Sequence, residues 1–208
     1  LGASGKNEHT PAPNPSTQTF DNVPHLAMLR SSSKDEFDIH QHFNGAAIKA
    51  RKEIENQSIP TGNKPFCLHG YCSICASPQT FQVSQMYSST SLPDGRIIPN
   101  WREHLNCLGC GSVNRLRAAY NILKSAFDVP PDADIYITEQ VTPAYELFKK
   151  LFPKTVGSEY LGSELSGGAI RNGIRHEDIQ ALSFSDRSFD WILSFDVLEH
   201  VPFPKNAF

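Results

Sequence analysis

The chain has 208 residues, of which 39% are hydrophobic, enough for one ordinary domain or for two small ones and a tail. Its 19 basic and 22 acidic residues give a formal net charge of -3, which argues against a general binder of polyanions. No apolar run approaches the ~20 residues of a membrane span, so we expect neither a membrane partner nor a signal peptide. The 5 cysteines include two CxxC pairs, which favours a reduced compartment, and the cytoplasm is the default.

The N-terminal region predicts a tail followed by one helix. Residues 1–34 are rich in Pro, Ser, Thr, Asn and Gly without apolar periodicity, so we expect a disordered tail. Residues 35–65 predict an amphipathic helix over 35–56, capped by Ser33 or Asp35, and then a linker. Its apolar positions are Phe37, Ile39, Phe43, Ala47, Ala50 and Ile54. Since the chain begins with Leu and ends in what reads as a helix start, we expect a fragment cut at both ends.

Residues 66–112 hold all the cysteines and predict a small β-unit, with short alternating apolar runs and a turn at Pro93-Asp94-Gly95. Two CxxC hairpins point four thiolates at one centre, which is the closed tetrahedral geometry of structural zinc. With every position filled by protein, such a site has no place for a water and is not catalytic. Core thiols without a metal are the alternative. The predicted ligands are Cys72, Cys75, Cys107 and Cys110.

Other residues near the cysteines leave two questions open. Cys67 and His69 either replace one ligand or are bystanders, since Cys is often simply buried. A zinc ribbon can also bind nucleic acid, but few aromatic residues interleave with the nearby cations and the charge is modest, so we expect no nucleic-acid partner. Those cations are Arg96, Arg102, Arg115 and Arg117.

From residue 113 the pattern changes to alternating helices and strands, which predicts a parallel α/β sheet. Four large residues near the C-terminal strand are expected in the core: Phe184, Phe189, Trp191 and Ile192. The predicted elements are a helix over 113–127, a strand over 135–138, a helix over 143–152, a strand over 155–161, a glycine-rich turn, and strands over 173–179 and 189–198.

Polar residues follow each predicted strand, and open parallel sheets bind ligands at the carboxyl ends of their strands. Glu159 lies 20 residues after Glu139, a spacing that suits a carboxylate accepting from the ribose hydroxyls of an adenosyl cofactor. Asp178 stands where a carboxylate can accept from an adenine amino group. Each residue alone has a simpler role, as a helix cap or in a solvated turn. Their occurrence after one strand after another favours a ligand site more than any single residue does. The candidates are Glu139, Gln140, Thr142, Glu159, Asp178, Asp196, Glu199 and His200.

The run HEDIQALSFSDRSFDWILSFDVLEHVPFP resembles the stretch from the third to the fourth strand of class I S-adenosylmethionine-dependent methyltransferases, especially the type 11 group. The shared features are an acidic residue (Asp178), a Leu-Ser-Phe step at 182–184, Phe189-Asp190, and Leu-Glu-His-Val at 198–201. Upstream, NWREHLNCLGCGSVNRLRAA resembles the zinc-ribbon-like segment before the methyltransferase domain in some bacterial members. The resemblance covers residues 66–208.

The resemblance implies S-adenosylmethionine as cofactor, with Glu159 on the ribose, Asp178 and Ile179 at the adenine, and residues 193–200, including Asp196 and Glu199, beside the methyl donor. The reaction is then an in-line displacement at the sulfonium methyl, which depends chiefly on alignment. His200 acts as a general base or has a structural role at the strand tip. The methyl acceptor, a small molecule or another class, is not identified by these residues.

Two departures from the family pattern matter. The family's first strand runs into a GxGxG turn, whereas this chain has ITEQVTP, so Glu139, Gln140 and Thr142 contact the cofactor differently or binding is weakened. Family domains also continue past the fourth strand. We therefore expect an α/β fold: a partial Rossmann-like methyltransferase sheet of four strands in residues 113–208, preceded by a zinc-ribbon β-unit and an N-terminal helix. A non-catalytic zinc ribbon with a degenerate Rossmann-like binding module is the alternative.

Overall fold

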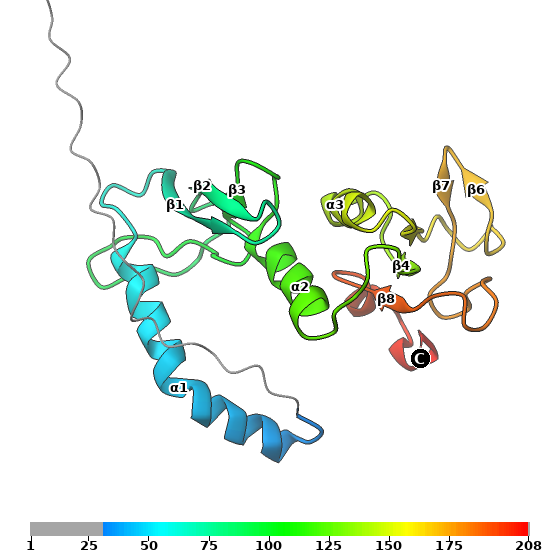
Figure 1. The fold of residues 1–208 in the computed structure, drawn as a ribbon, viewed down its shortest axis with the longest axis horizontal. Helices are drawn as coiled ribbons and strands as arrows, with labels where there is room; N and C mark the ends of the chain where they lie inside the picture. The colour runs from blue at the N-terminus through cyan, green and yellow to red at the C-terminus, as the bar shows by residue number, and fades with distance from the viewer. Residues whose placement is uncertain (1–30, 208) are drawn as a thin grey trace, which may run out of the picture. The chain divides into compact units, whose positions relative to one another are not determined.

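A computed structural model describes residues 31–207, and the chain divides into two compact units, Leu1–Pro60 and Thr61–Phe208 (Figure 1). The predicted disordered tail lies outside the described residues up to position 30. Within the described part of the chain, no helix is both long and apolar enough to cross a membrane.

Helix α1, Lys34–Gln57, extends one residue beyond the predicted range at each end. Of the two cap candidates, Ser33 is the N-cap, because its hydroxyl accepts from the backbone N–H of Glu36. The apolar positions differ in exposure: Ala47 is buried, whereas Phe37 and Phe43 are 51% and 70% exposed. The predicted apolar face is therefore covered in the middle of the helix and open in its first half.

The cysteine-rich region is a three-stranded antiparallel sheet in the order β1-β2-β3, made of Phe66–Cys72, Ser77–Val83 and Leu105–Cys107. We call residues 66–112 the ribbon. Its core is small and consists of Cys72, Phe81 and Cys107. The predicted turn is present, since Gly95 has a positive φ of 86° and its N–H donates to the carbonyl of Leu92.

The rest of the second unit contains the predicted parallel sheet, with shorter strands. Its order is β5-β4-β8, formed by Val156–Gly157, Ile135–Ile137 and Trp191–Leu193. A parallel bridge between Glu159 and His176 adds a fourth segment beyond β5. Helix α2, Asn114–Ser125, precedes the sheet, and α3, Pro143–Leu151, connects β4 to β5. The strand–helix–strand order predicted from the sequence is thus present in the structure.

The central strand β4 is buried along its whole length, which explains its unbroken apolar run Ile-Tyr-Ile. Helix α3 begins as the sequence predicts, because the Thr142 hydroxyl accepts from the Tyr145 N–H and Pro143 occupies the first turn. Both helices cover this part of the sheet. The buried core is Leu116, Leu123, Val129, Ala133, Ile135, Ile137, Ala144, Phe148 and Phe152.

The predicted third strand over 173–179 is divided in the structure. His176 forms a parallel bridge to Glu159 at the end of the second predicted strand, as expected, whereas the first part of the segment pairs elsewhere. Strand β7, Ile174–Arg175, forms a hairpin with β6, Ile170–Arg171, which the sequence placed in the glycine-rich turn. Asn172 and Gly173 take φ values of 53° and 80°, as a two-residue hairpin of type I′ requires. The Asn-Gly pair was therefore a turn signal that the sequence reading missed.

The predicted fourth strand over 189–198 is also shorter than expected. Strand β8 ends at Leu193, and the short 3-10 helices η1, Leu198–His200, and η2, Pro204–Ala207, follow it. Ile192, predicted in the core, is 59% exposed because β8 lies at the edge of the described sheet. Phe184 and Phe189 do pack with the central strand, at 5.0 and 5.3 Å from the ring of Tyr136.

We predict that Gly173→Ala lowers the free energy of unfolding of the second unit by about 1 kcal/mol, because a Cβ is strained at this positive φ. The space around the position is open, so the cost is one of backbone conformation alone. Urea unfolding followed by tryptophan fluorescence measures it. Gly45→Ala in α1, also in open space, is the control and should stabilise its helix by roughly 0.5–1 kcal/mol. Equal effects of both substitutions would contradict the assignment.

Candidate functional site

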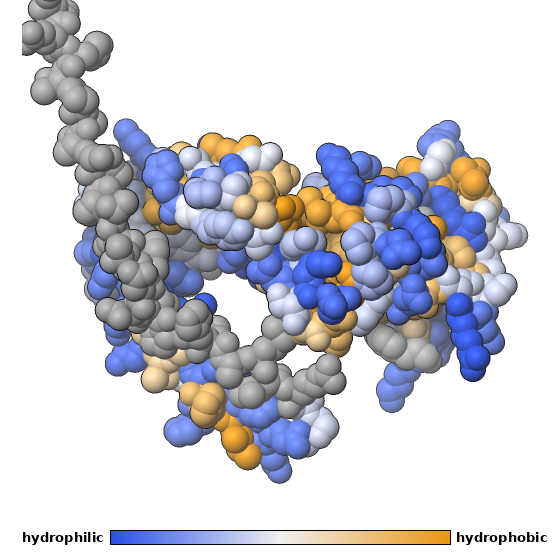
Figure 2. Space-filling view, in the orientation of Figure 1, coloured by the Kyte–Doolittle hydropathy of each residue, from blue (hydrophilic) through white to orange (hydrophobic). Residues whose placement is uncertain are grey.

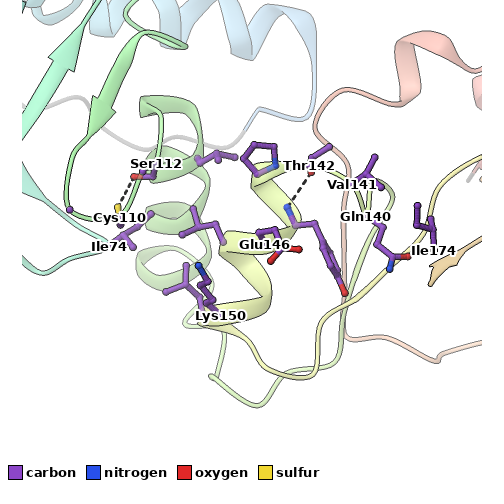
Figure 3. A pocket seen from close by; sticks show the side chains of 16 residues that line it. Ile74, Cys110, Ser112, Gln140, Val141, Thr142, Glu146, Lys150 and Ile174 are labelled. Carbon is purple, nitrogen blue, oxygen red and sulfur yellow. Dashed lines mark hydrogen bonds between the residues drawn. The ribbon is translucent and has the colours of Figure 1, made fainter. Parts of the chain in front are cut away.

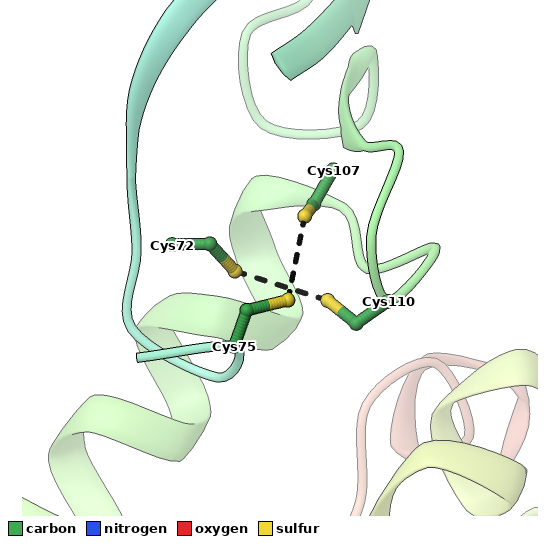
Figure 4. Close-up of side chains that lie close together, drawn as sticks. All are labelled: Cys72, Cys75, Cys107 and Cys110. Carbon is green, nitrogen blue, oxygen red and sulfur yellow. Dashed lines mark hydrogen bonds between the residues drawn. The ribbon is translucent and has the colours of Figure 1, made fainter. Parts of the chain in front are cut away.

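The four predicted cysteine ligands converge at the knuckles of the ribbon (Figure 4). Their sulfur atoms all lie within 4.8 Å of one another. The Cys72–Cys110 and Cys75–Cys107 Sγ pairs are both 3.8 Å apart, too far for a disulfide. A tetrahedral zinc–sulfur site with bonds of about 2.3 Å has sulfur atoms about 3.8 Å apart. The residues present therefore fit a zinc ion held by protein ligands alone.

The environment of these thiols differs from one sulfur to the next. Burial raises the pKa of Cys75 and of Cys72. Burial acts on Cys110 too, but hydrogen bonds from the hydroxyl and backbone of Ser112 outweigh it and lower the pKa of this thiol to about 7. The Ser112 Oγ lies 3.0 Å from the Cys110 sulfur. A cation at the centre supplies what the buried thiols lack, a positive charge that stabilises their thiolate forms.

Cys67 and His69 lie outside this cluster. Both are on the exposed side of β1, and the Nδ1 atom of His69 lies 3.2 Å from the hydroxyl of Thr80. The alternation of a β-strand explains the separation, because Cys67 and His69 are an odd number of residues from Cys72. The question that the sequence left open is answered by the four-cysteine set, which needs neither residue.

A cavity lies at the carboxyl edge of the parallel sheet and has a volume of about 290 Å³; we call it the edge pocket. That size is near the lower end of the range for ligand pockets, roughly 300–1,000 Å³. It contains three of the predicted site residues: Asp178, Ile179 and His200. The remaining lining residues are Tyr136, Thr138, Ser158, Tyr160, Glu177, Gln180, Val197, Val201 and Pro202.

The turn after β4, where the sequence lacks glycines, is held by two carboxylates. Glu139 is buried and accepts from the Thr138 hydroxyl and from the backbone N–H of Phe195. Burial raises the pKa of Glu139. Glu159, the predicted ribose ligand, accepts through Oε1 from the Val141 N–H at 2.8 Å. Both carboxylates thus hold polypeptide in place at the carboxyl edge of the sheet.

Three other predicted residues of this region also bind other parts of the chain. The Gln140 side chain donates to the Gly173 carbonyl and accepts from the Arg175 N–H, so it fastens the hairpin to the turn. Thr142 caps α3. Asp196 pairs with Arg115, with Nη1 at 2.6 Å from Oδ1 and 2.7 Å from Oδ2.

The last predicted residues occupy the short helix η1. Glu199 is exposed and is not among the residues that line the edge pocket. His200, next to it, lines the pocket with its side chain 77% exposed. The predicted set is therefore divided: its members after the third and fourth strands reach the pocket in part, and those after the first strand mainly build the turn.

One buried polar cluster was missed by the sequence reading. Glu177 has a fully buried side chain that accepts from Arg175 and from the hydroxyl and N–H of Ser183. Burial alone raises its pKa, but these hydrogen bonds outweigh burial and lower it. The Arg175 guanidinium also lies 4.3 Å from the ring centre of Phe184. The one sequence signal for this cluster is the opposite charge of residues 175 and 177, because residues two apart in an extended chain lie on the same face.

A larger groove of about 1030 Å³ lies between the ribbon and α3 (Figure 3). One wall contains Ile74, Cys110 and Ser112, and the other contains residues of α3 and of the turn before it, including Glu146. Figure 2 shows hydrophobic surface beside α3 in this region. Of the predicted cofactor residues, Gln140 and Thr142 line this groove and do not line the edge pocket.

Comparison with known proteins gives one match. Residues 144–208 match a family model described as a methyltransferase domain. The match begins in α3 and covers β5, the hairpin and β8, but neither the ribbon nor β4. No curated protein and no solved structure matched the chain. The match supports methyl transfer as the general activity of this region.

We predict that the purified protein retains about one zinc ion per chain, because the four sulfur atoms stand at zinc-binding separations. Cys72→Ser and Cys107→Ser, at the two buried positions, should abolish metal retention. Cys67→Ser, outside the cluster, is the matched control and should keep the metal. Elemental analysis of protein purified without chelator measures all four samples. An absence of zinc from the unsubstituted protein would contradict the site.

Proposed function

We propose that this chain is a class I S-adenosylmethionine-dependent methyltransferase, with the cofactor at the edge pocket and a structural zinc ion in the ribbon. The observation that carries the proposal is the coincidence of two independent findings. The methyltransferase match covers residues 144–208, and a pocket with Asp178, Ile179 and His200 in its lining lies at the carboxyl edge of the parallel sheet. Ligands of open α/β sheets bind at that edge.

The order of the parallel segments supports a Rossmann-like sheet. The strand after α3 lies on one side of β4, and β8 lies on the other. The chain therefore reverses direction of travel across the sheet at β4, which makes this strand a topological switch point. The edge pocket includes Tyr136 and Thr138 from β4 and the residue that follows it, so it opens beside that switch point.

Asp178 and Ile179 are our candidates for the adenine. Asp178 accepts from the backbone N–H of Gln180 at 2.9 Å through Oδ1, which fixes the orientation of its carboxylate. An adenine amino group needs one acceptor of this kind, and an apolar side chain such as Ile179 suits the ring face. Burial raises the pKa of Tyr136 to about 12, so this pocket residue remains a neutral hydroxyl that can donate or accept.

Glu159 is our candidate for the ribose hydroxyls; it does not itself line the edge pocket, but it lies in the chain between Ser158 and Tyr160, which do. Its Oε1 accepts from the Val141 N–H, so the same carboxylate that orders the turn would bind the sugar. A carboxylate has about four lone-pair positions, enough for both tasks. This double use offers an account of how a turn without glycines is kept in place.

When bound, S-adenosylmethionine supplies an electrophilic methyl group on a sulfonium centre. The protein's part is to align the acceptor with that group and to exclude water, and alignment alone contributes much of the rate enhancement in such reactions. His200 lines the pocket and is exposed enough to meet an acceptor, so it is the candidate to take a proton from an acceptor hydroxyl or amine through its ring nitrogen. The cytoplasmic location stays a prediction.

The second candidate function is a binding module without transferase activity, a zinc ribbon with a degenerate Rossmann-like domain. A specific observation favours it: the side chains of Glu139, Gln140 and Glu159 accept hydrogen bonds from backbone N–H groups of this chain, in the turn where a cofactor would bind. The two functions differ in cofactor binding, which the following titrations measure.

We predict that the protein binds S-adenosylmethionine in calorimetric titration and that Asp178→Ala weakens binding roughly 10- to 100-fold, as the loss of a hydrogen bond to a charged group implies. Glu164→Ala, at an exposed residue outside the pocket, is the control and should bind like the unsubstituted protein. A silent titration of the folded parent protein would remove the enzyme proposal and leave the binding module.

We predict that Glu159→Gln weakens S-adenosylmethionine binding about 10-fold while the turn stays folded, because the amide oxygen can still accept from Val141 but offers the ribose a weaker acceptor. Calorimetry measures the affinity, and circular dichroism checks the fold. Gln140→Glu is a useful counterpart, because it should disturb the hairpin contact without touching the ribose candidate. Unchanged affinity of Glu159→Gln would eliminate the ribose assignment.

A further inference from the structure

Helix α2 connects the ribbon to the parallel sheet and packs on both. It begins at Asn114, directly after the second cysteine knuckle. Leu116 and Leu123 on this helix belong to the core under the sheet. Arg117, one residue after Leu116, is buried against the ribbon. The first turn of α2 thus contains side chains that reach both the metal site and the sheet.

Arg117 extends from this helix to the backbone beside the second cysteine knuckle. Its guanidinium donates to the carbonyls of Ser112 and Leu105, the latter at 2.8 Å. It also lies 4.7 Å from the ring centre of Phe81, which shares the ribbon core with Cys72. A buried guanidinium needs opposite charge nearby, and four thiolates around one divalent cation carry a net negative charge.

Arg115, two residues earlier, binds the other side. Its Nη1 contacts both carboxylate oxygens of Asp196, and its Nε lies 3.2 Å from Oε1 of Glu103 in the ribbon. Asp196 stands between β8 and η1, in the segment that brings Val197 and His200 to the edge pocket. One arginine therefore joins the ribbon to the segment beside the pocket.

We propose that α2 transmits the order of the four-cysteine metal site to residues 194–201: Arg117 fastens the helix to the metal site, and Arg115 fastens Asp196 to the helix. Both arginines are positioning residues, since neither lines the edge pocket. The proposal rests on the zinc site and pocket of the proposed function, but it concerns the order of the segment and not methyl transfer.

The weight of the Arg115 contact depends on which other contacts hold this segment. Ion pairs at the surface usually contribute little, and the Asp196 side chain is 53% exposed. Here, however, the carboxylates of Asp196 and Glu103 both pair with one guanidinium, and a network of charges is stronger than an isolated pair. Three further contacts hold the start of the segment on the sheet: the Phe195 N–H donates to Glu139, the Thr138 hydroxyl donates to Ser194, and the Phe195 ring lies 5.5 Å from that of Phe148.

Amide hydrogen exchange of the zinc-loaded protein, without S-adenosylmethionine, tests the Arg115 step. Within residues 195–201, the amides of His200 and Val201 are hydrogen-bonded and provide the signal. Arg115→Met should make them exchange about three- to tenfold faster, the size of effect that follows from losing one modest contact. The amides of β4 should be unchanged, and zinc content should stay at the parent level.

Arg96→Met is the matched control. Arg96 also forms an ion pair in the ribbon, with Asp94, and the exposed fractions of that pair, 25% and 54%, nearly equal the 25% and 53% of the Arg115–Asp196 pair. Its partner in this ion pair is only two residues away and lies in the ribbon as well. Exchange in residues 195–201 should therefore be unaffected. Equal exchange in the Arg115→Met and Arg96→Met proteins would overturn the proposal.

The metal step is tested by Arg117→Met and by removal of zinc. Arg117→Met should lose zinc to a competing chelator about tenfold faster than the parent, whereas Arg117→Lys should restore part of the retention by keeping the charge. Removing zinc from the parent should speed exchange at 195–201 more than at β4, and should add little in Arg115→Met. Uniform acceleration at both segments, or none, would count against transmission through α2.

These outcomes separate the proposal from the proposed function. Exchange is measured without cofactor, so a silent titration with S-adenosylmethionine leaves the result on residues 195–201 intact. Conversely, tight cofactor binding together with unchanged exchange in Arg115→Met would leave the methyltransferase proposal standing and remove this one. A parent protein that holds no zinc is detected beforehand by elemental analysis and would overturn the metal step.

Discussion

The convergence of four sulfur atoms, all within 4.8 Å of one another, is the constraint on which the ribbon depends. Its buried cluster is small, Cys72, Phe81 and Cys107 with a few partly buried neighbours, and small cores usually need a disulfide or a metal to offset the entropy of ordering the chain. A cation held by the four sulfur atoms would add ligand bonds to this core and would neutralise thiolates that otherwise repel one another. The position of α2 follows, because the helix begins just after the second knuckle and inserts Arg117 beside the cluster.

At the carboxyl edge of the parallel sheet, side chains hold the turn after β4 in place. Where other open α/β sheets bring backbone close to a ligand with glycines, this chain uses side-chain carboxylates and one amide to hold the turn after β4. Such a turn has less freedom to approach a ligand but is fixed in place before one arrives, which lowers the ordering cost of binding.

The sequence allowed prediction of those parts whose signal is local or strictly spaced. The CxxC pairs, the cap at Thr142 with Pro143, and the buried run of β4 each have one physical meaning at short range. Partners of single charged residues could not be predicted, because Arg115–Asp196 and Glu159–Val141 join positions distant in sequence. The hairpin at Asn172 was predictable and was missed, since its Asn-Gly signal lay inside a stretch read as a glycine-rich turn.

The contact of Gln140 with the hairpin has a consequence for how the site responds to acidity. An amide does not ionise, so its two hydrogen bonds to Gly173 and Arg175 persist at any pH at which the protein is folded. The neighbouring Glu139 does ionise, and burial raises its pKa. The contact between the hairpin and Gln140 is therefore independent of pH, whereas the contacts that Glu139 makes in the same turn are not.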